Sequence, residues 1–155
     1  MACEFRDRRR IEFYETDMAG IVHFSNFFRF MEATEHAFFR SLGLSLHQDD
    51  GRRMTGWARV QASCEYQAPL CYQDEVEIEL RVREKTSSSL AYDFVFRRVD
   101  EASATAAEPE IARGSLQVVH VARERGETRM RASPMPAEVT RAIEIAPATA
   151  SRRNS

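Results

Sequence analysis

Asp17 is the residue in this chain whose surroundings best suit chemistry. It lies in residues 14–32, which read YETDMAGIVHFSNFFRFME. Gly20 permits a tight turn after the acid, and Ser25 or Asn26 can cap a helix. A carboxylate would then face a helix N-terminus, where unpaired N–H groups suit a carbonyl oxygen that becomes an oxyanion during acyl transfer. In such a site Asp17 would be the nucleophile or the general base.

Spacing alone also allows a structural role for Asp17. An Asp near a Gly commonly forms a turn, because its side chain accepts hydrogen bonds from nearby backbone amides. This is the commoner role of an acid in such a position, and the residues by themselves favour it.

Glu32 and His36 raise the question of a metal site, since they lie four residues apart on the predicted helix. A divalent metal site needs three or four converging ligands, and no Cys or His cluster completes a set here. A pair on the helix surface is the better interpretation, and we expect no metal. Glu32 could instead act as a second acid near the cleft.

Helical spacing of apolar residues marks residues 26–42, and Gly43 is expected to end that helix. Phe28 and Phe39 widen the apolar surface beyond one stripe, so the helix should be buried on most sides. A first strand is expected over residues 8–14.

From residue 58 onward the apolar period changes to two, which indicates half-buried antiparallel strands. The alternating residues fall in three groups: Val60, Ala62, Cys64 and Tyr66; Val76, Ile78, Leu80 and Val82; and Leu90, Tyr92, Phe94 and Phe96. A last strand is expected over about residues 110–121, with polar connections over residues 85–89 and 100–109. A short helix over residues 137–145 should precede a disordered tail, residues 147–155.

One helix followed by consecutive antiparallel strands is an α+β pattern. A curved antiparallel sheet wrapped around one long central helix accounts for both the buried helix and the alternating strands. We expect a single domain over residues 1–146, because 155 residues suffice for one substantial core.

Charge and cysteine content narrow the possible partners. The formal net charge is −2, from 22 basic and 24 acidic residues, so no overall field favours nucleic acid or an anionic membrane. Three cysteines without metal-ligand spacing favour reduced thiols. The first residues lack the apolar stretch of a signal peptide, and no later run reaches membrane-spanning length. We therefore expect a cytoplasmic protein.

The motif around Asp17 resembles that of the hotdog-fold acyl-CoA thioesterases, and most closely the 4-hydroxybenzoyl-CoA thioesterase-like family. The shared features are the acid, Gly20 three residues later and the run IVHFSN before an aromatic-rich helix. Downstream, residues 66–70 (YQAPL) followed by Asp74 are similar to the family's strand-end proline and following acid. The resemblance covers roughly residues 8–145.

This resemblance implies hydrolysis of an acyl-CoA thioester to a carboxylic acid and CoA, without a metal or redox cofactor, in a dimer or tetramer whose active sites lie at the subunit interface. Asp17 takes the catalytic role, and the backbone N–H of Phe24 polarises the carbonyl. Phe24 stands where some relatives carry His, which removes one acid–base group. His23 and Asn26 would lie in the pocket or support it.

The CoA phosphates would meet surface cations from the partner subunit, for which Arg59, Arg83 and Lys85 are the candidates. An acyl-carrier protein could replace CoA, and the acyl group could be aromatic or aliphatic. Two other functions stay open: a hotdog hydratase or dehydratase acting on acyl thioesters, and a non-catalytic module that binds acyl-CoA or an acyl carrier.

Overall fold

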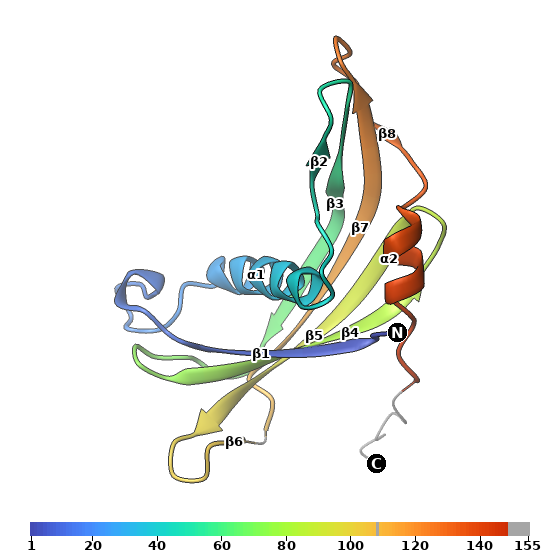
Figure 1. The fold of residues 1–155 in the computed structure, drawn as a ribbon. Helices are drawn as coiled ribbons and strands as arrows, with labels where there is room; N and C mark the ends of the chain where they lie inside the picture. Colours follow the sequence, from blue (N-terminus) through green and yellow to red (C-terminus); the bar gives the residue numbers. More distant parts are fainter. Residues whose placement is uncertain (108, 149–155) are drawn as a thin grey trace.

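An antiparallel sheet curls around one long helix in the computed structural model, which describes residues 1–107 and 109–148 (Figure 1). The strand order in the described part is β1-β4-β5-β7-β3-β2, with β6 beside β5 and β8 beside β7. The strands are β1 (Glu4–Arg10), β2 (Gln48–Asp49), β3 (Arg53–Tyr66), β4 (Glu75–Lys85), β5 (Ser89–Asp100), β6 (Thr105–Ala106), β7 (Ala112–Glu124) and β8 (Arg131–Ala132). The helices are the 3₁₀ turn η1 (Phe13–Glu15), α1 (Asn26–Ser41) and α2 (Ala137–Ala142). The predicted α+β hotdog fold is confirmed.

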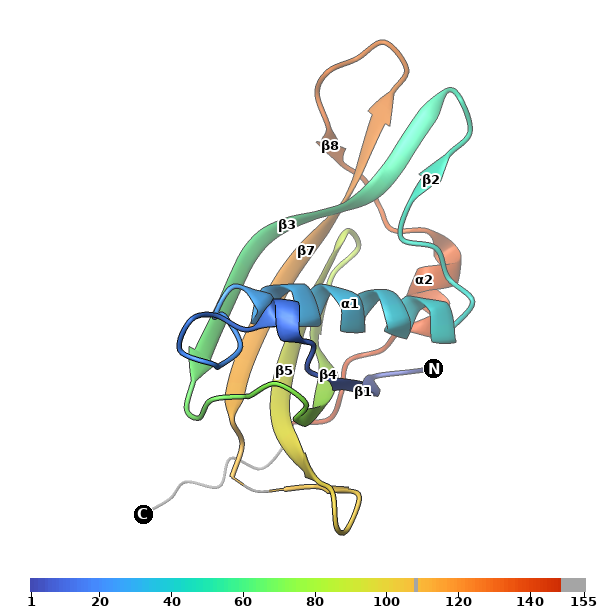
Figure 2. The same cartoon turned by 90° about the vertical axis from the view of Figure 1, so that its left-hand side faces the viewer.

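Helix α1 crosses the concave face of the sheet, as Figure 2 shows. Its buried side chains follow a spacing of three and four residues along one face: Phe27, Phe30, Met31, Thr34, Glu35, Phe38 and Phe39. The predicted helix is confirmed and Phe39 is buried, but the single chain does not show the expected burial on most sides, because Arg29, Glu32, Ala33, His36, Arg40 and Ser41 are exposed. Gly43 follows its end with a φ of +70°, a backbone conformation that glycine adopts without steric cost.

Strands β4 and β5 confirm the predicted alternation. Val76, Ile78, Leu80 and Val82 of β4 and Leu90, Tyr92, Phe94 and Phe96 of β5 are all buried in the core. Between the apolar residues of β4 lie Glu75, Glu77 and Glu79, which pair with arginines of β1. Charges thus tie β1 to β4 on one face, while apolar residues pack on the other.

The expected first strand was wrong in its bounds. Strand β1 spans Glu4–Arg10 and pairs with β4 over its whole length, because the acids of β4 give its arginines partners. Residues 13–15 instead form η1, in which the Glu15 N–H donates to the carbonyl of Glu12 at 3.0 Å.

The third strand also differs from the expectation. β3 begins at Arg53, and Val60, Ala62 and Tyr66 are exposed rather than half-buried. β3 pairs with β7 on one side, but on the other side only Met54 and Thr55 pair with β2. Within the described residues, no strand pairs with the outer edge of β3 over residues 56–66. The segment with the predicted apolar alternation therefore has one open edge.

The C-terminal segment lies on the opposite side of the sheet from α1 (Figure 1). Helix α2 is shorter than the expected residues 137–145, because the backbone of Ile143 is already extended. Residues 149–155 of the expected tail lie outside the described residues. Among the described helices, none has both the length and the apolarity needed to cross a membrane.

Candidate active site

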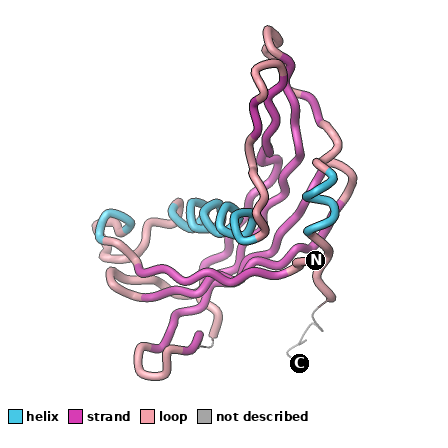
Figure 3. The backbone as a smooth tube through the Cα atoms, in the orientation of Figure 1, coloured by secondary structure: helices cyan, strands magenta, loops and turns pink. Residues whose placement is uncertain are grey.

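Asp17 lies in the loop that joins η1 to α1. Figure 3 shows this connection as a pink loop between the short helix and the long one. The Asp17 N–H donates to the carbonyl of Ile21 at 2.9 Å, and the Gly20 N–H donates to the carbonyl of Asp17 at 3.0 Å. Gly20 has a φ of +80°, as the predicted turn requires. One carboxylate oxygen of Asp17, Oδ1, accepts the Ala19 N–H at 2.8 Å. Within the described residues the other oxygen accepts no hydrogen bond, and the side chain is exposed.

The loop is fastened to the connection between β3 and β4. The Val22 N–H donates to the carbonyl of Leu70 at 2.8 Å, and Ile21 forms a β-bridge with Cys71. These contacts close one side of a cavity of about 490 Å³. Its lining residues are Asp17, Ile21, Val22, Phe24, Phe27, Tyr66, Gln67, Ala68, Pro69 and Leu70. Asp17 thus lies at a cavity whose other lining residues are mostly apolar.

The backbone at the start of α1 leaves one donor open. The N–H groups of His23 and Asn26 are used, donating to the carbonyls of Glu15 at 3.0 Å and His23 at 2.9 Å. The Phe24 N–H donates no hydrogen bond within the described residues. The Phe24 carbonyl accepts the Tyr66 hydroxyl at 3.0 Å, which fixes this peptide from the β3 side. Asp17 and Phe24, the residue with the open N–H, therefore line one cavity.

Neither predicted cap side chain caps α1. Ser25 already has helical backbone angles, and its hydroxyl lies 2.7 Å from Nδ1 of His23. The first helix N–H groups are met by backbone instead, since Phe27 donates to the carbonyl of Phe24. Asn26 is the first helical residue, and its Nδ2 donates to the carbonyl of Glu15 at 2.8 Å.

His23 is exposed and does not line the Asp17 cavity. Its ring lies against Phe24, with 4.6 Å between the ring centroids. It thus supports the turn at the helix start.

Glu32 lies away from the Asp17 cavity and faces Arg59, at 3.6 Å. The Arg59 guanidinium also donates to Oε1 of Glu35 at 2.5 Å, so Arg59 is paired with two acids of helix α1. Glu35 is completely buried, and burial raises the pKa of its carboxyl although Arg59 acts to lower it. Glu35 was not predicted to have a role, because the sequence around a single acid on a helix does not indicate that its side chain is buried.

The other two candidate CoA ligands are likewise engaged elsewhere. Arg83 donates to Asp93 at 2.7 Å. Lys85 donates to the carbonyls of Thr140 and Ile143, each at 2.7 Å, and so holds α2. None of the three cations lines the Asp17 cavity of its own chain, and their role as ligands supplied by the partner subunit stays a prediction.

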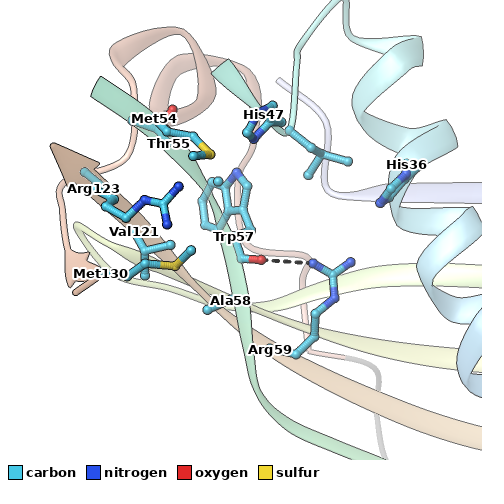
Figure 4. Close-up of a pocket in the computed structure, with 13 residues that line it drawn as sticks. His36, His47, Met54, Thr55, Trp57, Ala58, Arg59, Val121, Arg123 and Met130 are labelled. Carbon is cyan, nitrogen blue, oxygen red and sulfur yellow. Dashed lines mark hydrogen bonds between the residues drawn. The ribbon is translucent and has the colours of Figure 1, made fainter. Parts of the chain in front are cut away.

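A second cavity, of about 480 Å³, lies at the other end of α1 (Figure 4). Trp57 and Met54 of β3 form part of its wall, while His36 of α1 and Arg59 contribute polar groups. It contains no residue of the Asp17 loop, so it carries none of the candidate chemistry by itself. The described residues form no group of three or more His, Cys, Asp or Glu side chains that could hold a metal ion.

The fold and the site define the class of this protein: it is a hotdog-fold thioester hydrolase. The model of the thioesterase-like superfamily matches residues 11–143, and the chain belongs to that family. The suspected likeness to the 4-hydroxybenzoyl-CoA thioesterases is confirmed.

Three known proteins illustrate this likeness. A protein of Aquifex aeolicus (strain VF5) named "Putative esterase" is 39% identical over 101 residues, which cover 64% of this chain and 77% of the relative. The structure of BH1999 gentisyl-coenzyme A thioesterase is 27% identical with a TM-score of 0.69, covering 88% of this chain and 99% of that one. The 4-hydroxybenzoyl CoA thioesterase of Pseudomonas sp. strain CBS-3 is 21% identical with a TM-score of 0.75, covering 91% of this chain and 99% of that one.

Proposed function

We propose that this protein hydrolyses an aromatic acyl-CoA, with Asp17 as the catalytic carboxylate and the Phe24 N–H as the donor to the thioester carbonyl. One observation carries the proposal: Asp17, whose carboxylate is exposed, and Phe24, whose backbone N–H donates no hydrogen bond within the described residues, line the same cavity at the start of α1. A donor fixed in the backbone stabilises the developing oxyanion without having to reorganise during the reaction.

Two routes use this arrangement. In the first, the Asp17 carboxylate attacks the thioester carbon, CoA leaves as the thiolate, and water hydrolyses the resulting mixed anhydride. In the second, Asp17 removes a proton from the water that attacks the carbon directly. In both routes the carbonyl oxygen gains negative charge next to Phe24.

The apolar wall and the relatives support an aromatic acyl group. The rings of Phe27 and Tyr66 meet edge to face with 5.0 Å between centroids, and both line the cavity. Such an arrangement presents ring faces and edges to which an aromatic group can pack. The named relatives act on 4-hydroxybenzoyl-CoA and gentisyl-CoA, which are aromatic thioesters.

We further propose that two copies of this chain assemble through β3. The open edge over residues 56–66 presents unpaired backbone groups, which another strand can pair. Antiparallel pairing about a two-fold axis places the end of one β3, with Tyr66, beside the beginning of the other. The second cavity, with Trp57 of the partner subunit, would then adjoin the Asp17 cavity.

A panel of acyl-CoA thioesters tests this function with the unmodified protein. We expect release of free CoA thiol to be fastest for benzoyl-CoA and its hydroxylated derivatives, and slower for aliphatic chains of similar volume. Water addition to an enoyl-CoA without thiol release would support the hydratase instead. Tight binding with no turnover of any thioester would support the non-catalytic module.

A further inference from the structure

An ion pair between the partly exposed Arg9 and the buried Glu15 joins strand β1 to the segment that precedes Asp17. The Glu15 residue is 4% exposed. Its Oε2 accepts a hydrogen bond from Nη2 of Arg9 at 2.8 Å, and its Oε1 accepts the Glu12 N–H at 2.8 Å. Both oxygens of this carboxylate are therefore held.

Arg9 differs from the other arginines of its strand. Arg6, Arg8 and Arg10 pair with the glutamates of β4 on one face of the sheet. Arg9 faces the opposite side, where its guanidinium carbon lies 4.2 Å from the ring centroid of Phe30 in α1. Such a pair adds little net stability, because the buried Glu15 carboxylate loses its hydration while solvent still reaches the Arg9 side chain, which is 28% exposed. What the Arg9–Glu15 pair supplies is a defined geometry, since the planar guanidinium fixes the direction of its partner.

The main chain of Glu15 reaches the start of α1. Its carbonyl oxygen accepts both the His23 N–H at 3.0 Å and Nδ2 of Asn26 at 2.8 Å. One residue thus links β1, the chain leading into the Asp17 turn and the first turn of the helix. His23, whose N–H donates to Glu15, directly precedes Phe24, whose N–H is open.

From these contacts we propose that Glu15, held by Arg9, is the positioning residue that sets the Asp17 carboxylate and the Phe24 N–H relative to each other. This inference rests on the proposed function. Asp17 lies two residues after Glu15, and Phe24 directly follows His23, so a shift of Glu15 moves both reacting groups. Misplacement by about 1 Å can cost about 100-fold in rate.

Glu15→Gln tests the proposal, because the amide keeps the size of the side chain but cannot pair with Arg9 as a charge. We expect kcat to fall by about 10- to 100-fold with KM nearly unchanged. Hydrogen–deuterium exchange of residues 16–26 should become faster. If Glu15→Gln does not fold, Arg9→Lys keeps the positive charge without the fork and should lower kcat in the same direction by a smaller factor.

Glu79→Gln is the matched control, because Glu79 is also a buried carboxylate paired with an arginine, Arg97, at 2.9 Å. It lies on β4 and does not line the Asp17 cavity, so it should lower stability without changing kcat. Wild-type kcat and exchange in folded Glu15→Gln would overturn the proposal, as would an equal kcat loss in Glu79→Gln. Wild-type activity in Asp17→Asn would instead refute the role of Asp17, and the exchange data would then decide separately whether Glu15 orders the loop.

Discussion

Asp17 combines the two roles that its sequence context allowed. Its Oδ1 forms the turn hydrogen bond with Ala19, which is the structural role. Its other oxygen is left for a substrate or water, and this is what the proposed catalysis requires. The hydrogen bond from the Ala19 N–H also restricts the orientation of the carboxylate. The structural role therefore helps to preorganise Asp17 for the proposed catalysis.

Sequence reasoning located Asp17, Gly20 and Phe24 because a motif of neighbouring residues identifies them. It missed the support from Tyr66 and Glu15, since their contacts depend on how distant segments fold together. Arg59 of the partner subunit stays a predicted CoA ligand, but sequence reasoning did not reveal that Arg59 pairs with Glu35 of its own chain. Whether a cation is free or paired depends on three-dimensional neighbours that spacing does not encode.

The Tyr66 hydroxyl should contribute to the rate through the Phe24 peptide. Tyr66→Phe removes the hydrogen bond to the Phe24 carbonyl, and we expect kcat to fall by about 2- to 10-fold, the effect of one hydrogen bond of about 0.5–1.5 kcal/mol. Tyr72→Phe serves as the control, because Tyr72 is exposed and does not line the cavity. Steady-state kinetics measure both kcat values. Equal values in the two variants would show that the Tyr66 hydroxyl does not contribute to the rate.

Glu35 should make stability fall as pH rises. Burial raises its pKa above the ordinary 4.5, so above that pH the folded state binds more protons than the unfolded state. Its contribution to the free energy of unfolding is therefore fully present at low pH and is lost as the pH rises through the folded-state pKa.

Urea unfolding of wild type and Glu35→Gln between about pH 4 and 8 measures this dependence. The stability of Glu35→Gln relative to wild type should increase with pH. Glu32→Gln, on the exposed side of Arg59, should show a smaller trend. A pH-independent difference between wild type and Glu35→Gln would contradict the stated direction.

At the scale of elements, the periodic segments were predictable and the edges were not. Helix α1 and strands β4 and β5 follow their apolar periods closely, because each has a face fixed against the core. β1 escaped prediction over residues 4–7, since its charged residues are satisfied by the acids of β4. Strand β3 shows the same apolar alternation as a strand paired on both sides. Alternation indicates which face of the sheet a side chain lies on, and it does not indicate whether another strand pairs with the edge.

Gly114 of β7 lies close to Met31 of α1. A methyl group there would meet Met31 of the helix and the Ser63 carbonyl, the latter at 3.2 Å. We expect Gly114→Ala to lower the free energy of unfolding by about 1–3 kcal/mol, as overpacked core substitutions do. Gly56→Ala is the comparison, since its added methyl group meets nothing closer than 3.8 Å. Chemical denaturation that ranks the two variants equally would argue against close packing at Gly114.

At the scale of the whole molecule, the proposed assembly through β3 would bring the second cavity of one subunit beside the Asp17 cavity of the other. Sedimentation equilibrium should give a mass of twice 17.8 kDa, or a larger even multiple, at concentrations where the enzyme is active. The two cavities at opposite ends of the open edge would then form one continuous site in each half of the dimer. A fully active monomer would show that the Asp17 cavity works without a partner.

A comparison of kcat between Asp17→Asn and Asp100→Asn shows whether Asp17 is the catalytic carboxylate. Asp100 accepts the Ala102 N–H at 2.8 Å in the same kind of turn, far from the Asp17 loop in sequence and outside its cavity. We predict that Asp17→Asn lowers kcat for the best aromatic acyl-CoA by about 100-fold or more, while Asp100→Asn keeps the wild-type rate. A wild-type kcat in Asp17→Asn would contradict the account.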